Sequence, residues 1–136
     1  MSNVGNNFTK GSTEMDEANN YADEAAKAAA DFVGRCLFDQ HRGVLDCGDK
    51  VVLFGNDAYD SDPRSRKEVE LVRSGLEAMG LQAHGFGTGY PDEDGNGSWA
   101  VVVENYSRQP MNIPALDALV RQAWTKACEM ESAGLL

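Results

Sequence analysis

The alternation of apolar and polar positions along the chain predicts six elements, in the order helix, strand, helix, strand, strand, helix. Apolar residues recur at helical spacing over residues 13–38, 63–79 and 113–133. Shorter apolar runs at 51–54, 81–86 and 98–106 have the length that is typical of strands. Residues 39–49 show neither pattern, and Gly43 and Gly48 within them predict a connection.

Capping residues place the ends of the two later helices. Asp62 is a good N-cap, and Pro63 follows at the first helical position, where its missing N–H costs nothing. Gly80 is the expected C-terminal glycine of this helix. Asn112 is the expected N-cap of the last helix, and Gly134 is expected to end it.

The predicted fold class is α/β, on the border with α+β. The strand at 51–54 is apolar on both faces, which is typical of a strand with helices above and below it. Strand, helix and strand over residues 51–86 predict a βαβ unit with two parallel strands, and the strand at 98–106 should run antiparallel to the second. We therefore expect a small three-stranded mixed sheet packed by helices. Its open edges favour a homo-oligomer.

The length of 136 residues suits one core, and we expect a single domain over residues 12–136 after a flexible arm at 1–11. No apolar run approaches the ~20 residues that span a bilayer. The N-terminus lacks the basic and apolar segments of a secretory signal. Three cysteines fit reduced thiols better than a disulfide framework. We expect a cytoplasmic protein that makes no membrane contact.

The chain is strongly acidic, with a formal net charge of −10. Such a charge disfavours direct nucleic-acid binding and suits a basic protein surface or a cation, although it also serves solubility. Acidic residues concentrate on the first helix and in the glycine-rich loop at 85–98. The expected partner-binding residues are Glu17, Asp23, Glu24, Asp92, Glu93 and Asp94.

A small-molecule site is expected where the first strand ends. Ligands of open α/β sheets bind at the carboxyl ends of the strands. Here the apolar run stops at Gly55, polar residues follow it, and the next helix starts with basic residues. The candidate ligand-binding residues are Asn56, Asp57, Asp60, Arg64, Arg66, Thr88 and Tyr90.

The chemistry of that site has two interpretations. Carboxylates on one short loop could hold Mg²⁺ or Ca²⁺, but the spacing of Asp57, Asp60 and Asp62 does not match a calcium loop. The start of the following helix, with Arg64 and Arg66, could instead hold a small anion. Turn, cap and local ion-pair roles are the simpler explanation of all these residues.

Other catalytic and metal motifs are weak. The spacing of Cys36, His41 and Cys47 is unusual for zinc, and no fourth ligand is close in sequence. The chain has no nucleophile elbow, phosphate-binding loop or His-Glu-x-x-His motif, so enzymatic activity is not the favoured expectation.

Two functional hypotheses follow. The favoured one is a small acidic, non-enzymatic binding protein that acts as an inhibitor or adaptor on a protein partner, with a basic nucleic-acid-binding protein as one candidate. The alternative is a small-molecule or nucleotide-binding protein, or a metal-dependent hydrolase, with its site at the C-terminal end of the first strand.

Overall fold

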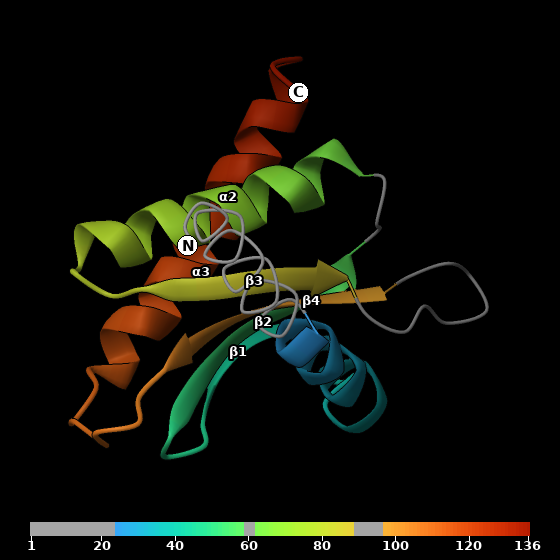
Figure 1. The fold of residues 1–136 in the computed structure, drawn as a ribbon. Coiled ribbons are helices and arrows are strands. Elements are labelled where there is room, and N and C mark those ends of the chain that lie inside the picture. Colours follow the sequence, from blue (N-terminus) through green and yellow to red (C-terminus); the bar gives the residue numbers. More distant parts are fainter. Residues whose placement is uncertain (1–23, 59–61, 89–96) are drawn as a thin grey trace, which may run out of the picture.

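The computed structural model describes residues 24–58, 62–88 and 97–136 (Figure 1). The α/β class is confirmed, and the predicted elements occur in the predicted order. One additional strand lies between the first helix and the first predicted strand. The predicted arm at 1–11 and the predicted helix start at 13 lie outside the described residues. The elements are a helix over residues 24–36, β1 (Arg42–Asp46), β2 (Lys50–Ala58), α2 (Pro63–Ala78), β3 (Ala83–Thr88), β4 (Gly97–Glu104) and α3 (Ile113–Ser132).

The sheet has four strands in the order β1-β2-β4-β3, and all neighbouring strands are antiparallel. This corrects the expectation of a three-stranded mixed sheet. β2 and β3 do run in the same direction, but β4 lies between them. The reason is burial: β4 is buried from Gly97 to Val103, so it is stable only with a strand on each side and helices on both faces.

The additional strand, β1, occupies the segment expected to be a connection. It forms a hairpin with β2 in which the amide of Cys47 donates to the carbonyl of Lys50 at 2.9 Å. Gly48 is the first of the two loop residues and has a φ of +88°, as a type II′ turn requires. The Gly48-Asp49 pair between two apolar runs is a known hairpin signal, which the prediction of a connection overlooked.

The predicted caps of α2 and α3 are present. The Asp62 carboxylate accepts a hydrogen bond from the amide of Arg64 at 3.0 Å, and Asn112 accepts one from Ala115 at 3.1 Å. Gly80 and Gly134, just beyond the two helices, both have positive φ. Among the described residues, no helix has the length and hydrophobicity needed to cross a membrane.

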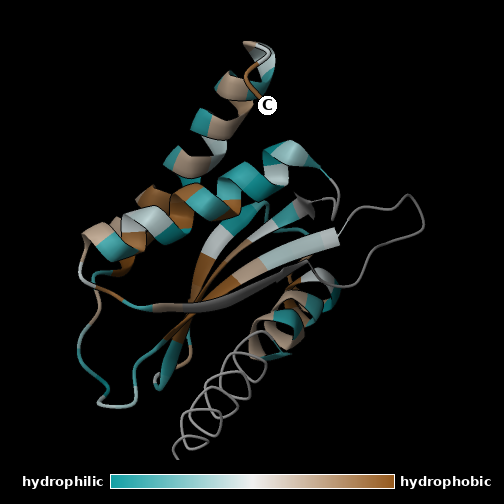
Figure 2. Cartoon of the chain, turned by 45° about the horizontal axis from the view of Figure 1, so that its top comes forward, coloured by the Kyte–Doolittle hydropathy of each residue, from teal (hydrophilic) through white to brown (hydrophobic). Residues whose placement is uncertain are grey.

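Two cores lie on opposite faces of the sheet, so helices cover both sides as predicted (Figure 1). On one face, alternate residues of the central strands pack against α2 and α3. On the other, they pack against the helix at 24–36, whose contacts are mostly alanine. Hydrophobic residues accordingly run through the middle of the strands (Figure 2). The second core contains Ala26, Ala30, Val33, Val52, Phe54, Ala100 and Val102.

Gly55 of β2 allows a close approach that no larger residue would permit. A Cβ added there would lie 2.7 Å from Cε2 of Trp99 and 2.8 Å from Nε of Arg42. Both side chains are buried, and neither can move away without disturbing its neighbours. The Trp99 Nε1, which also faces this position, is a buried polar atom without a hydrogen-bond partner. The indole is therefore held by packing rather than by a hydrogen bond.

We predict that Gly55→Ala lowers the free energy of unfolding by about 1–3 kcal/mol, because overpacking displaces a rigid ring and a buried guanidinium. Gly75→Ala is the matched control. Its Cβ would meet Leu119, a partly buried side chain that can rotate, and the helix gains about 1 kcal/mol of propensity. Urea denaturation measures both. Equal losses in the two variants would contradict this account of Gly55.

Candidate functional site

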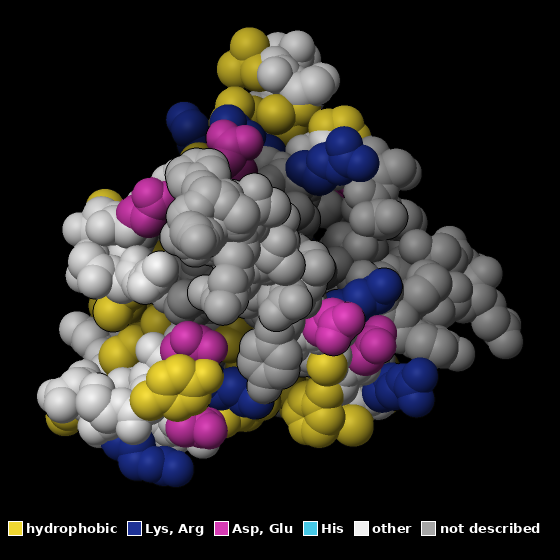
Figure 3. All heavy atoms as spheres, viewed as in Figure 1, with side chains coloured by type: hydrophobic (Ala, Val, Ile, Leu, Met, Phe, Trp, Pro, Cys, Tyr) yellow, Lys and Arg dark blue, Asp and Glu magenta, His cyan; other side chains and the backbone are white. Residues whose placement is uncertain are grey.

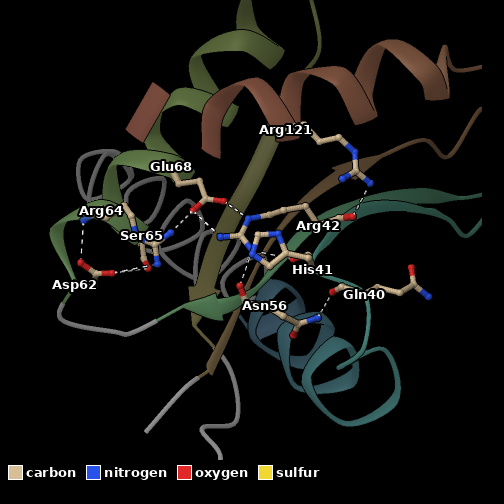
Figure 4. Close-up of polar contacts among 9 residues, drawn as sticks. All are labelled: Gln40, His41, Arg42, Asn56, Asp62, Arg64, Ser65, Glu68 and Arg121. Atoms are coloured by element: carbon tan, nitrogen blue, oxygen red, sulfur yellow. Dashed lines mark hydrogen bonds and ion pairs between the residues drawn. The ribbon is translucent and has the colours of Figure 1, made fainter. Parts of the chain in front are cut away.

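A buried ion pair links β1 to α2. Arg42 and Glu68 are 3% and 0% exposed. The guanidinium meets the carboxylate with two nitrogens, through Nη2 to Oε1 at 3.0 Å and through Nε to Oε2 (Figure 4). Its Nη1 donates to the carbonyls of His41 at 2.8 Å and Asn56 at 2.6 Å. Two charges can remain so deeply buried because most of their hydrogen-bonding groups have partners.

Aromatic and polar contacts from α3 complete this cluster. The Arg42 guanidinium carbon lies 5.6 Å from the centre of a Trp124 ring. His41 meets Trp124 edge-on, with ring centres 4.7 Å apart. Arg121 Nη2 donates to the carbonyl of Arg42 at 3.1 Å. The start of β1 is thus bound to both α2 and α3.

Asn56, one of the candidate ligand-binding residues, is buried and its amide is engaged within the protein. Its Nδ2 donates to the carbonyls of Leu37 at 2.9 Å and Gln40 at 2.6 Å, and its Oδ1 accepts from the Ser98 hydroxyl. These contacts tie the end of the N-terminal helix to β2 and β4. The ligand-binding role of Asn56 stays a prediction. Its observed contacts give it a second role, which is to hold these segments together.

The basic start of α2 is occupied by ion pairs of its own. Arg64 Nη2 lies 3.4 Å from Asp62 Oδ2, and its Nη1 lies 3.7 Å from Glu68 Oε1. Ser65 donates to the same Asp62 carboxylate at 3.3 Å. Arg66 is exposed. These contacts match the simpler interpretation, in which the charges around the helix start balance one another.

The strand register brings two predicted site segments to the same end of the sheet. Ala58 of β2 pairs with Gly97, and Thr88 of β3 pairs with Trp99, so the carboxyl ends of β2 and β3 flank the start of β4. Two strand spacings, about 10 Å, separate them. Asp57 lies in β2 beside this end. The candidates Asp60 and Tyr90 lie outside the described residues, as do the partner-binding candidates Glu17, Asp23, Asp92, Glu93 and Asp94.

Within the described ranges, no group of three or more His, Cys, Asp or Glu side chains has a metal-binding arrangement. Cys36 and Cys47, two of the zinc candidates, are free and exposed. The proposed Mg²⁺ or Ca²⁺ site depends on the side chains of Asp57 and Asp60, which are not among those described.

A second site lies on the other face of the sheet, between the N-terminal helix and the β1–β2 hairpin. We call it the helix–hairpin groove. Its volume is about 580 Å³, within the range of ligand-binding clefts. Phe32 is 48% exposed on it. The lining residues are Glu24, Ala25, Ala28, Ala29, Phe32, Val33, Leu45, Cys47, Lys50 and Val52.

The helix–hairpin groove contains one residue predicted to bind a partner, Glu24, which is exposed. Sequence reasoning missed the groove itself because its floor belongs to the hairpin, and β1 was not predicted. The surface over the N-terminal helix, on the face drawn in Figure 3, carries hydrophobic, acidic and basic side chains next to one another.

Comparisons with protein families, with curated proteins and with solved structures find no match to this chain.

We predict that Arg42→Met and Glu68→Leu each lower the free energy of unfolding by about 3–5 kcal/mol, because each removes the two-nitrogen contact that balances a buried charge, and the 3.7 Å contact of Arg64 with Glu68 replaces it only in part. The double variant should recover part of that loss, since neither charge then remains. A double-mutant cycle by urea denaturation measures the coupling.

The exposed pair Lys67–Glu70, at 2.8 Å, is the matched control. A cycle on Lys67→Met and Glu70→Leu should give a coupling below about 1 kcal/mol. A comparable coupling energy in the two cycles would contradict the prediction that the buried pair is coupled more strongly than an exposed one.

Proposed function

We propose that this protein is a non-enzymatic binding protein that acts as an inhibitor or adaptor on a protein partner, which it engages through the helix–hairpin groove. The half-exposed Phe32 beside an apolar hollow supports the proposal. Aromatic side chains are enriched at the centres of protein interfaces, where a few anchors in pockets supply most of the binding energy.

The charge of the chain supports a basic partner. The net charge is −10, and Glu24 lies on the helix–hairpin groove. Opposite charges on two proteins steer their encounter and disfavour wrong partners. A basic nucleic-acid-binding protein is a candidate of this kind, and its inhibition would require no nucleic-acid contact by this chain.

The proposal includes a cytoplasmic setting, which the free cysteines support. It also keeps the homo-oligomer, since β1 is an edge strand of the sheet. Arg121 covers one carbonyl of that edge, at Arg42, so self-pairing through β1 would use the remaining edge groups.

Filling the helix–hairpin groove tests the proposal. The protein is used to capture partners from an extract of its source, and the partner is identified, purified and titrated by calorimetry. Ala28→Trp should weaken this binding by roughly tenfold or more, a loss of about 1.4 kcal/mol, because the indole occupies the groove from an exposed helix position.

The matched control is Ala118→Trp, an exposed alanine on α3, which should leave the affinity within about twofold. Thermal unfolding of both variants checks that the fold is intact. Unchanged binding by a folded Ala28→Trp variant would refute the groove as the partner site.

The convergence of the β2 and β3 ends favours a second candidate: a site for a small molecule or nucleotide, or a metal-dependent hydrolase centre, near Asp57 and Asp60. Our proposal predicts that native mass spectrometry of the protein from its source shows no retained ligand. A mass excess that Asp57→Asn with Asp60→Asn removes, and that Asp46→Asn with Asp49→Asn retains, would establish the second candidate instead.

A further inference from the structure

The two faces of the sheet differ in how many described helices cover them. α2 and α3 both pack on one face. The described cover of the other face is the helix at 24–36 alone, which packs over Val52, Phe54 and Val102 (Figure 1). Beside this helix, Leu45 and Val52 form part of the lining of the helix–hairpin groove. The groove therefore lies where a second helix would complete the layer.

The wall of the groove suits a helix as its occupant. Ala25, Ala28 and Ala29 line it, and their small side chains allow a neighbouring helix to approach to the short end of the usual 8–10 Å spacing. Phe32 projects from the same helix as an apolar anchor. The lining runs from Glu24 to Val33, which corresponds to about 14 Å, or between two and three helical turns.

The charges at the groove are available to an incoming chain. Within the described part of the protein, Glu24 and Lys50 line the groove without forming an ion pair. Lys50 is the basic residue of the lining, and Asp46 and Asp49 lie within four residues of it in the hairpin. Lys27 is exposed on the helix itself. Around the groove, the carboxylates of Glu24, Asp46 and Asp49 thus outnumber the two lysines, and the chain as a whole has a net charge of −10, so charge complementarity favours a basic occupant.

We infer that the partner presents a basic amphipathic helix, whose apolar stripe packs into the helix–hairpin groove over two to three turns. This inference rests on the proposed function and adds the chemistry of the partner. Apolar residues at i, i+3, i+4 and i+7 would contact Ala28, Phe32 and Leu45, and lysines or arginines at the flanks would face the acidic residues.

A designed peptide tests the inference without knowledge of the partner. The probe is a fluorescein-labelled helical peptide of about 14 residues, with leucine at the apolar positions and lysine elsewhere. Fluorescence anisotropy measures its binding to the full chain. A scrambled isomer has the same charge and no apolar stripe, and it should bind roughly tenfold more weakly. A peptide with glutamate in place of lysine should bind more weakly still.

Two charge reversals separate the effect of a charge at the groove from the effect of the net charge of the chain. Glu24→Lys and Glu131→Lys change the net charge equally, but Glu131 is exposed near the C-terminal end of α3. Glu24→Lys should lower the affinity for the lysine peptide by roughly fivefold, and Glu131→Lys should lower it by less than about twofold, because charges close to the bound peptide are screened least. Ala28→Trp should abolish the preference for the amphipathic isomer.

Equal binding of the two isomers, or equal effects of the two reversals, would overturn the inference. So would a dimer that Ala28→Trp dissociates, since a second copy would then occupy the groove. If the peptide fails while the purified partner still depends on Ala28, the proposed function stands and only the helical, basic partner is wrong. If the peptide binds as expected but the partner is insensitive to Ala28→Trp, the proposed function fails.

Discussion

The buried ion pair between Arg42 and Glu68 is the interaction on which most of the described structure depends. It joins the first residue of β1 to the middle of α2, while Asn56 and Trp124 bring β2 and α3 to the same guanidinium. Burying two charges is costly, and the cost is offset only when the geometry supplies partners for them. Few other arrangements of these four elements would do so. We therefore regard the pair as a device that selects one packing of the elements, more than as a source of net stability.

Asn56 and Arg42 both fix the segment that joins the N-terminal helix to β1. Asn56 holds the carbonyls of Leu37 and Gln40, so the helix at 24–36 is attached to the sheet where β1 begins. Arg42, the first residue of β1, follows this segment, and its side chain lies on the opposite face of the sheet, against α2. The position of the N-terminal helix, and with it the width of the helix–hairpin groove, therefore depends on the same corner of the sheet that holds the ion pair. A functional surface on one face is supported by a polar cluster on the other.

Local signals predicted much of the fold. Asp62, Asn112, Gly80 and Gly134 act on their own helix ends, so their roles follow from neighbours a few residues away. β1 was missed because a five-residue strand that begins with a charged arginine lacks the expected pattern. The arginine is buried only because Glu68, 26 residues later, comes to meet it. The order of the strands was also predicted wrongly. The inner position of β4 depends on how its burial compares with that of the other strands, and no single strand shows this on its own.

The features of the candidate sites likewise fall into those that local sequence determines and those that tertiary contacts determine. The sequence by itself determined the fold class, the helix caps and the acidic character, because composition, periodicity and capping are properties of short segments. Tertiary structure decided that Asn56 and Arg64 have partners inside the protein, that Arg42 is buried, and that an apolar groove lies beside Phe32. Each of these depends on contacts between segments far apart in the chain, and no local pattern encodes which segment a side chain will meet.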